Sequence, residues 1–541
     1  MKNLQLLDCT LRDGGYLNDW QFGYSNIVNI FERMVSSGVD ILEIGFLDGS
    51  RPFDLNRTIM PDTACAGAIY GNLDKKNTLI VGMIDFGTCP IGNLQPCAES
   101  YLDGIRVIFK KHIRNEAIAY CRQVKELGYK VFVQAVSITS YSEAELLDLV
   151  RLVNDFEPYA LSMVDTYGLL HQDNLYSIYR LLDQNLKASI AIGYHAHNNF
   201  QMGYANCIRM IEAKTERSML VDGTLYGMGK SAGNAPVELL AMYMNENCDK
   251  QYDINQMLEA VETSILDIYR VIPWGYNLFY YLAASNKCHP SYVSYLMNKK
   301  TLSIKSINDT LRKIDEEHKL MYDADTIEQL YRQYQECDCN DARALAELAE
   351  RLKNRRIIAI GPGSSTLTEQ DKWVDLFQQP QCAVVSINFI PDFVKPDFVF
   401  LTNSKRYVQL ANRLSEQECA DICIIATSNV TKASGLFQYE LNYSRLIDQQ
   451  AEVQDNSLFM FLRLMMELEV REIDLIGFDG YSETKMNYYK TNMEYANVRQ
   501  MAQRLNAYGQ NFIRAHQQQL NIHFITPSYY QIDSAQERIE G

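Results

Sequence analysis

The sequence lacks an excess of basic residues, a long apolar run and the grouped cysteines of a structural zinc site. Lys and Arg total 51 against 67 Asp and Glu, which gives a formal net charge of −16 at pH 7. Nucleic acids and anionic membranes are bound by clustered basic side chains, so this charge argues against a general affinity for either. No apolar run approaches the ~20 residues of a membrane span. We therefore expect no nucleic-acid partner and no membrane partner.

The chain contains 13 cysteines, an odd number, and most of them are scattered. This usage is typical of reduced thiols in a cytosolic protein. The close pairs Cys337–Cys339 and Cys419–Cys423 have no second pair or histidine nearby to complete a zinc site. The N-terminal segment reaches Asp8 and then Arg12 too early to contain the apolar core of a signal peptide. We expect a cytoplasmic protein.

Short apolar, β-rich runs alternate with longer helical patterns over the first 225 residues of this 541-residue chain. The runs are Leu4–Leu7, Val39–Gly45, Leu79–Ile84, Ile105–Phe109, Val131–Val136, Ala160–Val164, Ile190–Tyr194 and Met219–Val221. Each is followed by a segment long enough for a crossover helix, which predicts eight βα units and a TIM (β/α)8 barrel. The active site of such a barrel lies at the C-terminal ends of its strands.

Candidate metal ligands follow three of these predicted strands. Asp13 comes just after the first, His195 and His197 end the seventh, and Asn234 follows the eighth. Side chains two residues apart on a strand point to the same face, so both imidazoles can reach one ion. One carboxylate with two imidazoles suits Mn²⁺, Mg²⁺, Fe²⁺, Co²⁺ or Zn²⁺ and leaves positions open for a chelating substrate.

Three motifs carry these residues: Asp-Cys-Thr-Leu-Arg-Asp-Gly-Gly-Tyr at 8–16, His-Ala-His-Asn-Asn at 195–199 and Gly-Met-Gly-Lys-Ser-Ala-Gly-Asn at 227–234. They resemble the motifs of the DRE-TIM metallolyases, also termed the HMG-CoA lyase-like or pyruvate carboxyltransferase-type family. The second motif and Gly-Asn-Ala-Pro-Val-Glu at 233–238 are most similar to the 4-hydroxy-2-oxovalerate aldolase branch. The resemblance covers residues 1–260 and implies a TIM-barrel aldolase or lyase domain.

The resemblance implies that Asp13, His195 and His197 bind a divalent metal, with Asn234 as an outer or occasional direct ligand. Mn²⁺ or Mg²⁺ is the expected ion, with Zn²⁺ or Co²⁺ as alternatives. Arg12 would stabilise an enolate. The implied activity is cleavage or formation of a 4-hydroxy-2-oxoacid through a pyruvate enolate held by the metal, so a small 2-oxoacid is the expected substrate.

The chain departs from the aldolase pattern at Tyr16, where those aldolases carry a histidine base. Tyrosine has an ordinary pKa near 10 against about 6.5 for histidine, so it is a poor base at neutral pH. Tyr16 would then act as an acid or orient a water. His289, Tyr292, Glu43 and Asp165 are candidates for the missing base.

Glu43, Asp165 and Asn198 are also candidate substrate-binding residues, because each lies at or beyond the C-terminal end of a predicted strand. Glu43 could equally pair with a neighbouring basic residue. We favour a capping role for Asp8 over a catalytic one, and a packed position for His289 over a functional one.

Two alternative functions share this metal site. One is a Claisen-type synthase or lyase that uses acyl-CoA, although the motif at 233–238 and the absence of the lyase's glycine-rich cysteine loop argue against it. The other is a catalytically reduced barrel that serves as a binding or scaffold protein, a reading suggested by Tyr16. The presence of Arg12, Asp13, His195 and His197 argues against it.

Two further domains are expected after the barrel. Residues 261–350 have amphipathic helical patterns and an aromatic segment, Trp274–Tyr281, and we expect a helical extension over the barrel mouth. In the resembling family such an extension supports dimerisation, so we expect a homo-oligomer. Residues 351–541 return to alternating strands and helices, which predicts a Rossmann-like α/β domain.

The first strand of this last domain is followed by the turn Gly-Pro-Gly-Ser-Ser at 361–365, which can present backbone amides to a phosphate. The candidate nucleotide-binding residues are Gly361, Gly363, Ser364, Asn388 and Asp479. The pattern loosely resembles the nucleotide-sugar-binding half of certain bacterial glycosyltransferase-like proteins, which makes a nucleotide sugar a candidate ligand. Without a third glycine the turn is a weak signal for NAD.

Overall fold

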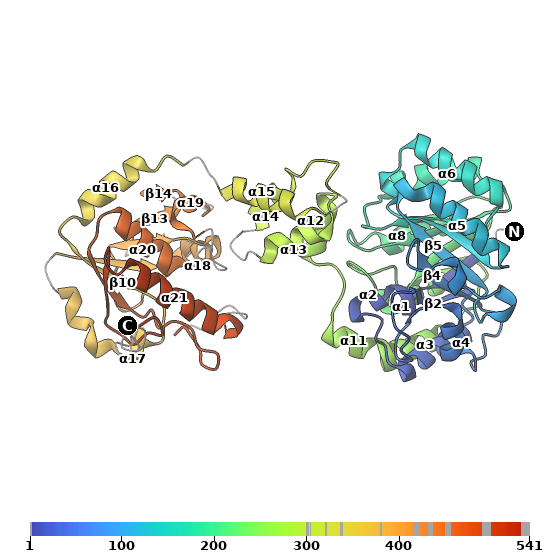
Figure 1. The fold of residues 1–541 in the computed structure, drawn as a ribbon, viewed down its shortest axis with the longest axis horizontal. Helices are drawn as coiled ribbons and strands as arrows, with labels where there is room; N and C mark the ends of the chain where they lie inside the picture. The colour runs from blue at the N-terminus through green and yellow to red at the C-terminus, as the bar shows by residue number, and fades with distance from the viewer. Residues whose placement is uncertain are drawn as a thin grey trace. The chain divides into compact units, whose positions relative to one another are not determined.

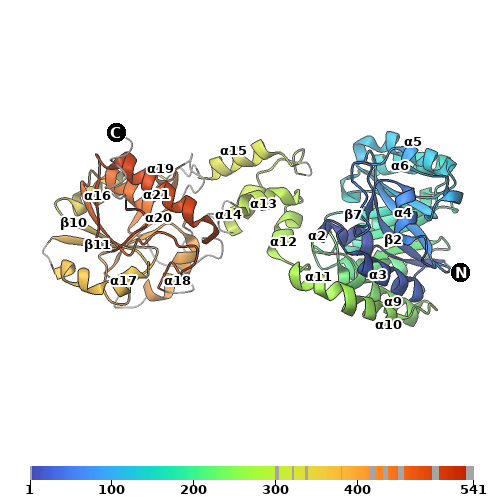
Figure 2. The same ribbon diagram turned by 60° about the horizontal axis from the view of Figure 1, so that its bottom comes forward.

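The computed structural model describes residues 3–298, 302, 304–319, 322–335, 339–378, 381–414, 419, 421–430, 437–448, 456–489 and 499–531. The chain divides into two compact units (Figures 1 and 2). Unit 1 is Met1–Val293 with Lys319–Met321, and unit 2 is Ser294–His318 with Tyr322–Gly541.

Unit 1 contains a closed barrel of parallel strands. In chain order they are β1 (Leu4–Asp8), β2 (Ile41–Leu47), β4 (Leu79–Asp85), β5 (Gly104–Phe109), β6 (Lys130–Ala135), β7 (Ala160–Asp165), β8 (Ala191–Ala196) and β9 (Met219–Gly223). Each strand pairs with the next, and β1 pairs with both β2 and β9, which closes the cylinder. Every predicted run overlaps one of these strands, so the predicted TIM barrel is confirmed. The two-residue strand β3 (Ile59–Met60) adds to β2.

Helices surround this barrel: α3 (Tyr24–Ser36), α4 (Thr63–Tyr70), α5 (Arg114–Glu126), α6 (Glu143–Phe156), α7 (Gln172–Asn185), α8 (Gly203–Ile211) and α9 (Val237–Asn247). Helix α6 illustrates how the sequence determines them. Ser142 and Glu145 form a capping box at its start, which satisfies backbone N–H groups of the first turn. Its apolar residues recur at helical spacing and are buried: Leu146, Leu149, Val150, Val153 and Phe156.

Unit 1 continues beyond the barrel through α10 (Ile254–Ala260), α11 (Leu266–Val271) and α12 (Leu278–Ser285) into α13 (Pro290–Asn298). Trp274 packs on this unit, because its Nε1 donates to the carbonyl of Tyr226 at 2.9 Å in the loop after β9. Tyr269 lies against the same indole, with ring centroids 4.8 Å apart. This part of the predicted helical extension therefore belongs to the barrel unit. The placement of the remainder over the barrel mouth stays a prediction.

Unit 2 holds helices α14 (Ile304–Leu311), α15 (Ala324–Gln335) and α16 (Ala342–Leu352), and then a seven-stranded parallel sheet in the order β14-β13-β12-β11-β10-β15-β16. Its strands are β10 (Arg356–Ile360), β11 (Cys382–Ile387), β12 (Phe398–Leu401), β13 (Cys423–Thr427), β14 (Tyr439–Leu441), β15 (Glu472–Ile476) and β16 (Asn521–Phe524). Successive strands run outward from β10 on one side and then restart at β15 on the other. This is the doubly wound arrangement, with its switch point between β10 and β15.

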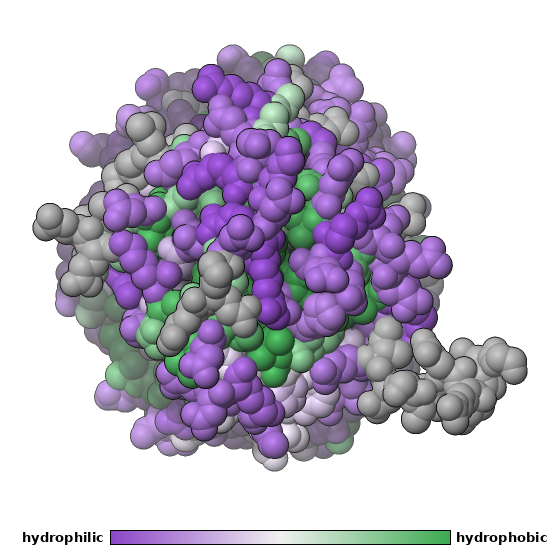
Figure 3. Space-filling view, turned by 90° about the vertical axis from the view of Figure 1, so that its left-hand side faces the viewer, coloured by the Kyte–Doolittle hydropathy of each residue, from purple (hydrophilic) through white to green (hydrophobic). Residues whose placement is uncertain are grey.

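Helices cover this sheet: α17 (Ser365–Thr368), α18 (Ser404–Leu414), α19 (Tyr443–Leu446), α20 (Ser457–Glu467) and α21 (Ala502–His516). Helix α20 is the central one, since its residues from Leu458 to Leu462 are all buried in the core of the unit. Figure 3 shows a face of unit 2 on which hydrophilic side chains dominate and apolar ones lie between them.

Candidate metal centre

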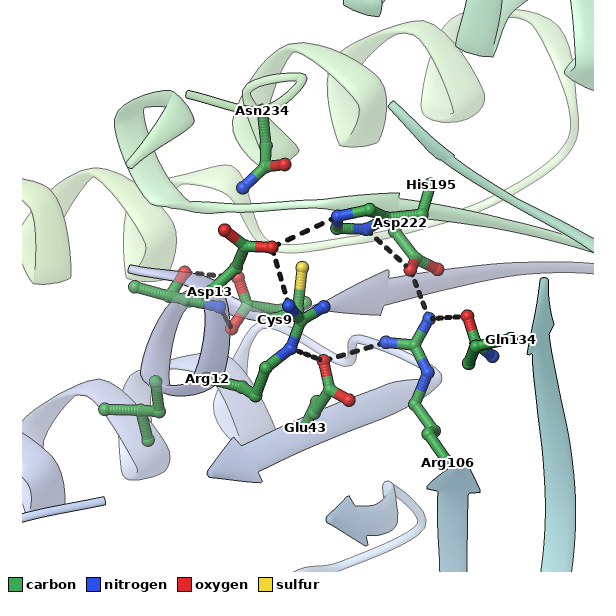
Figure 4. A network of polar contacts seen from close by, with 12 residues as sticks. Cys9, Arg12, Asp13, Glu43, Arg106, Gln134, His195, Asp222 and Asn234 are labelled. Atoms are coloured by element: carbon green, nitrogen blue, oxygen red, sulfur yellow. Dashed lines mark hydrogen bonds and ion pairs between the residues drawn. The ribbon is translucent and has the colours of Figure 1, made fainter. Parts of the chain in front are cut away.

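The three motifs of the first half of the chain meet at the C-terminal end of the barrel (Figure 4). Asp13 ends the short helix α1 (Thr10–Asp13), directly after β1, and its Oδ2 lies 3.1 Å from Nε2 of His195 in β8. Nε2 of His197 lies 3.9 Å from the same oxygen. The ligand atoms of all three residues fall within 4.8 Å of one another, and the side chains are buried. The structure thus brings together the predicted metal ligands.

Two buried atoms at this cluster have no hydrogen-bond partner among the described residues: His197 Nε2 and Asn234 Oδ1. The other ring nitrogen of His197, Nδ1, donates to the carbonyl of Asp165 at 3.0 Å, which leaves Nε2 with a free electron pair. Buried polar atoms are nearly always satisfied, so two orphans beside a carboxylate indicate a missing ligand. The donor set of carboxylate, imidazole and amide oxygen fits a divalent cation.

Gly229 keeps this space open. A Cβ at that position would lie 2.1 Å from Asn234 Nδ2 and 2.9 Å from Asp13 Oδ1. The protein therefore has a glycine where any side chain would displace two candidate ligands.

The electrostatic environment holds two of the three ligands, Asp13 and His197, in states that can bind a cation. Burial lowers the pKa of His197 to about 3, so its imidazole is neutral at neutral pH. Burial alone would raise the pKa of Asp13, but the guanidinium of Arg12 and the two imidazoles more than offset this and hold it well below its usual range. Neither His197 nor Asp13 needs to lose a proton near neutral pH. Burial lowers the pKa of the third ligand, His195, but its hydrogen bonds to Asp13 and Asp222 more than offset this and raise it, so metal binding there competes with a proton.

Beneath the candidate ligands lies a closed circuit of buried charged side chains. Arg12 Nη1 donates to Asp13 Oδ2 at 2.6 Å, and its Nε donates to Glu43 Oε2 at 2.8 Å. The same oxygen of Glu43 accepts from Arg106 Nη1 at 2.8 Å. The side chain of Arg12 is therefore fixed in orientation by two carboxylates.

The circuit continues from Arg106 back to the metal ligands. Arg106 Nη2 donates to Asp222 Oδ2, which also accepts from His195 Nδ1 at 3.0 Å. Gln134 accepts from Arg106 at 3.1 Å and braces it from β6. Because His195 Nε2 lies beside Asp13, the circuit closes (Figure 4). We term these six residues the charge ring: Asp13, Arg12, Glu43, Arg106, Asp222 and His195.

Sequence reasoning did not find Arg106, Asp222 or Gln134 as parts of the site. A charged or polar residue within an apolar strand was the available signal, since Arg106 stands between Ile105 and Val107. Glu43 lies at the site, but its carboxylate pairs with Arg12 and Arg106. This matches the alternative prediction that Glu43 pairs with a basic residue.

Tyr16, on the short helix α2 (Gly15–Asn18), lies at the barrel mouth. Its ring packs against Trp20 and Phe46, with centroids 4.9 and 5.9 Å away, and remains 37% exposed. Burial raises the pKa of its hydroxyl, so the group stays protonated at neutral pH. This favours the predicted role of acid or orienting group over that of base.

Asp165 and Asn198 hold the loops that carry the ligands. The carboxylate of Asp165 accepts from the backbone N–H groups of Leu169 and Leu170 at 2.9 and 3.0 Å, and burial raises its pKa to about 6. Asn198 Oδ1 accepts from the N–H of Gly203 at 3.0 Å. Substrate binding by these two residues stays a prediction.

Of the predicted residues beyond the barrel, Tyr292 lies in α13 and His289 directly precedes that helix. His289 is half-buried, and its Nδ1 accepts from the N–H of Ser291 at 3.2 Å, so the neutral ring carries its proton on Nε2. Burial lowers the pKa of His289, and the charges of Lys230 and Lys110 lower it further. A neutral ring protonated at Nε2 presents a donor, which disfavours His289 as the base. Tyr292 is fully buried. Asp8 accepts from Thr10 Oγ1 at 2.6 Å, as expected for a capping residue.

In unit 2, four of the five candidate nucleotide-binding residues meet at the switch point. Asp479 Oδ2 accepts from Ser364 Oγ at 3.1 Å and from the N–H of Ser365 at 2.8 Å, where α17 begins. A Cβ on Gly363 would lie 2.4 Å from Asp479 Oδ1, and one on Gly361 would lie 2.5 Å from a carbonyl of the loop after β15. The two glycines thus permit close contact between the loop after β10 and the loop after β15. The carboxylate of Asp479 accepts from the backbone N–H that a phosphate would use.

Asn388 lies at the end of β11, apart from these residues. Its side chain exchanges hydrogen bonds with Thr402 and donates to Ser457 Oγ at 2.6 Å, which ties two strand ends to the start of α20. Nucleotide binding by unit 2 stays a prediction.

Comparison with known proteins bears on the barrel. Residues 3–263 match the family model described as HMGL-like. The 4-hydroxy-2-oxovalerate aldolase of Chloroflexus aggregans is 26% identical over 276 residues, which cover 50% of this chain and 77% of that protein. The 4-hydroxy-2-oxovalerate aldolase 2 of Salinispora arenicola is 25% identical over 264 residues, 48% of this chain and 74% of that protein.

A solved structure of the N-terminal domain of a protein provisionally described as an aldolase, from Bacteroides vulgatus, has 23% sequence identity. Its TM-score is 0.47, and the match covers 56% of this chain and 98% of that one. Among the residues that the structure describes, no helix is long and apolar enough to cross a membrane. The family expected from the three motifs is confirmed: residues 3–263, which carry Asp13, His195 and His197, form a domain of the HMGL-like family.

Proposed function

We propose that unit 1 is a divalent-metal-dependent aldolase that cleaves or forms a 4-hydroxy-2-oxoacid, with pyruvate as one product. The buried cluster of Asp13, His195 and His197, with the unpartnered Nε2 of His197 beside it, carries this proposal. The name of the aldolase relatives supports the reaction class. The mixed donor set fits a divalent ion, and the family resemblance favours Mn²⁺ or Mg²⁺.

A divalent ion, when bound by these side chains with Asn234 beside them, supplies a Lewis acid that polarises the 2-oxo group. Arg12 is held by Asp13 and Glu43 through two of its nitrogens. Its remaining N–H groups donate to the 2-oxo oxygen as negative charge develops there. A preorganised donor of this kind contributes about 3–4 kcal/mol to a transition state.

In the cleavage direction the C4 hydroxyl loses its proton, the C3–C4 bond breaks and its electron pair forms the enolate. Protonation at C3 then gives pyruvate, and the C4 fragment leaves as an aldehyde. Tyr16, protonated at neutral pH, serves as a donor in these steps.

We assign the base to Asp85, the last residue of β4. Strand β4 is four strands from β8 in either direction around the barrel, so Asp85 lies across the mouth from the two histidines. Its side chain is exposed, and no residue in the described part of the chain donates a hydrogen bond to its carboxylate. Partial desolvation within the mouth raises its pKa and outweighs the opposing charges of Lys110 and Lys230, which brings the carboxylate closer to the working range of a base at neutral pH.

The test is pyruvate release by metal-stripped full-length protein resupplied with Mn²⁺, Mg²⁺ or Zn²⁺, across a panel of 4-hydroxy-2-oxoacids. We expect metal-dependent release that is lost in Asp13→Asn and retained in Asp267→Asn, a matched change at an exposed residue of α11. Asp85→Asn should lower kcat while metal affinity stays unchanged. Tight metal binding without release from any oxoacid would refute the aldolase, and turnover of an acyl-CoA thioester would then identify the alternative.

A further inference from the structure

Two lysines at the barrel mouth have no part in the chemistry described so far. Lys230 follows β9, and its backbone N–H donates to Asp13 Oδ1 at 2.8 Å, so the residue lies beside the metal centre. Its Nζ lies over the ring of Tyr16, 5.0 Å from the centroid. Lys110 follows β5, and both side chains are exposed. Within the described ranges, neither ammonium group forms an ion pair with a carboxylate.

The two lysines start from opposite sides of the mouth, and their charges interact with the same groups. Strands β5 and β9 are four strands apart in either direction around the barrel. The charges of Lys110 and Lys230 nevertheless reach one another, and both reach Asp85 and His289. Asp85 contributes one negative charge to this group, so the two ammonium groups leave an excess of positive charge.

The neighbouring residue Lys111 shows what a structural lysine does at this position. Its Nζ donates to the carbonyl of Ser140 at 2.8 Å and lies 3.3 Å from a carboxylate oxygen of Glu145. Lys110, one residue earlier, has no such partner in the described chain. A protein with a net charge of −16 has many carboxylates available, so two unpaired lysines beside a catalytic centre indicate a ligand.

We propose that Lys110 and Lys230 bind a carboxylate or phosphate at the far end of the aldehyde half of the substrate. This inference rests on the proposed aldolase function and extends it to a substrate class, the acidic 4-hydroxy-2-oxoacids. The metal ligands come from β1, from the β8 end and from the loop after β9, so a bound oxoacid extends from them across the mouth toward β4 and β5. An anionic group there gains charge-assisted hydrogen bonds to both ammonium groups.

The activity test runs in the condensation direction with pyruvate, supplied metal and matched aldehydes. Butanal is the neutral aldehyde, succinic semialdehyde carries a carboxylate on the same number of carbons, and glyceraldehyde 3-phosphate carries a phosphate. We expect kcat/KM for one or both anionic aldehydes to exceed that for butanal by on the order of 10- to 100-fold. Lys110→Met and Lys230→Met should each lower kcat/KM for the anionic aldehydes by much more than for butanal, and so remove most of this preference. The control Lys111→Met should retain it.

A binding measurement separates this inference from the proposed function. Calorimetric titration compares 2-oxoglutarate with 2-oxopentanoate, which has the same number of carbons and no distal carboxylate. We expect tighter binding of 2-oxoglutarate, lost in Lys110→Met and retained in Lys111→Met.

If no aldehyde is turned over, the proposed function fails and this titration still decides the inference. Equal binding of the two oxoacids would overturn it. So would turnover of butanal as efficient as that of the anionic aldehydes, or equal effects of Lys110→Met on all three.

Discussion

Replacing Arg106 with methionine tests the charge ring directly. Arg106 is 1% exposed and bridges Glu43 and Asp222, which are themselves buried. Methionine keeps an unbranched apolar stem but ends two atoms earlier than arginine, so the change removes the charge and the hydrogen bonds and leaves a small unfilled volume. Removing one partner of a buried ion pair leaves the other charge uncompensated and costs about 3–5 kcal/mol. We expect Arg106→Met to lower the free energy of unfolding of unit 1 by that amount.

The measurement is urea unfolding of the full chain in a Trp373→Phe background. The chain has three tryptophans, and the remaining two, Trp20 and Trp274, lie in unit 1, so their fluorescence follows that unit alone. The control is Arg33→Met, which breaks an exposed guanidinium–carboxylate pair with Glu259 and should cost under about 1 kcal/mol. A loss of less than about 1 kcal/mol in Arg106→Met would refute the view that the ring is a coupled buried network.

A double-mutant cycle measures the coupling within the ring. Asp222→Asn alone should reduce metal affinity by on the order of 10- to 100-fold, because Asp222 orients His195 through its Nδ1–H. The double variant Arg106→Met/Asp222→Asn should lose less free energy of unfolding than the two single variants lose in sum, by about 1–3 kcal/mol. Additive losses would show that Arg106 and Asp222 act independently.

Three further predictions follow from other parts of the structure. Burial raises the pKa of Asp8 to about 7, so the folded state holds a proton that the unfolded state releases near pH 4. The free energy of unfolding should therefore fall by about 2–3 kcal/mol between pH 5 and pH 8, a dependence absent from Asp8→Asn in urea titrations at each pH. Gly229→Ala should abolish metal binding measured by calorimetry, since its Cβ would collide with Asn234, whereas Gly67→Ala, with no atom within 4 Å of the added carbon, should bind normally. Asp479→Ala should lower the stability of unit 2 by about 1–3 kcal/mol in thermal unfolding, because it removes hydrogen bonds from the loop after β10; an unchanged midpoint would show that this carboxylate is not structural.

The barrel and its metal ligands were predictable from sequence because both depend on local pattern. Apolar runs of the right length specify buried parallel strands, and the His195-x-His197 spacing places two imidazoles on one face. The charge ring was not predictable in this way. Arg106 meets Asp222 across the barrel interior, a contact that depends on which side chains of β5 and β9 point inward at the same level. A single sequence gives no information on that register.

The turn after β10 shows a different limit. Glycines at 361 and 363 are compatible with a phosphate loop and equally with close packing of two protein loops, because both need backbone without a Cβ. The structure shows close packing of the two loops, with Asp479 accepting from the backbone N–H of Ser365 at the start of α17. Asp479, the acceptor, lies more than a hundred residues away in the chain, so local sequence could not reveal this contact.

The charges of the ring connect the metal centre with the lysines at the mouth. With His195 neutral, as coordination of a metal requires, the ring holds three carboxylates and two guanidinium groups, an excess of one negative charge in a buried site. A divalent cation reverses this to an excess of one positive charge, which the carboxylate of a 2-oxoacid neutralises. The centre can therefore accommodate one anionic group without an uncompensated buried charge, and a second anionic group on the same substrate requires cations of its own. Lys110 and Lys230 supply them at the mouth.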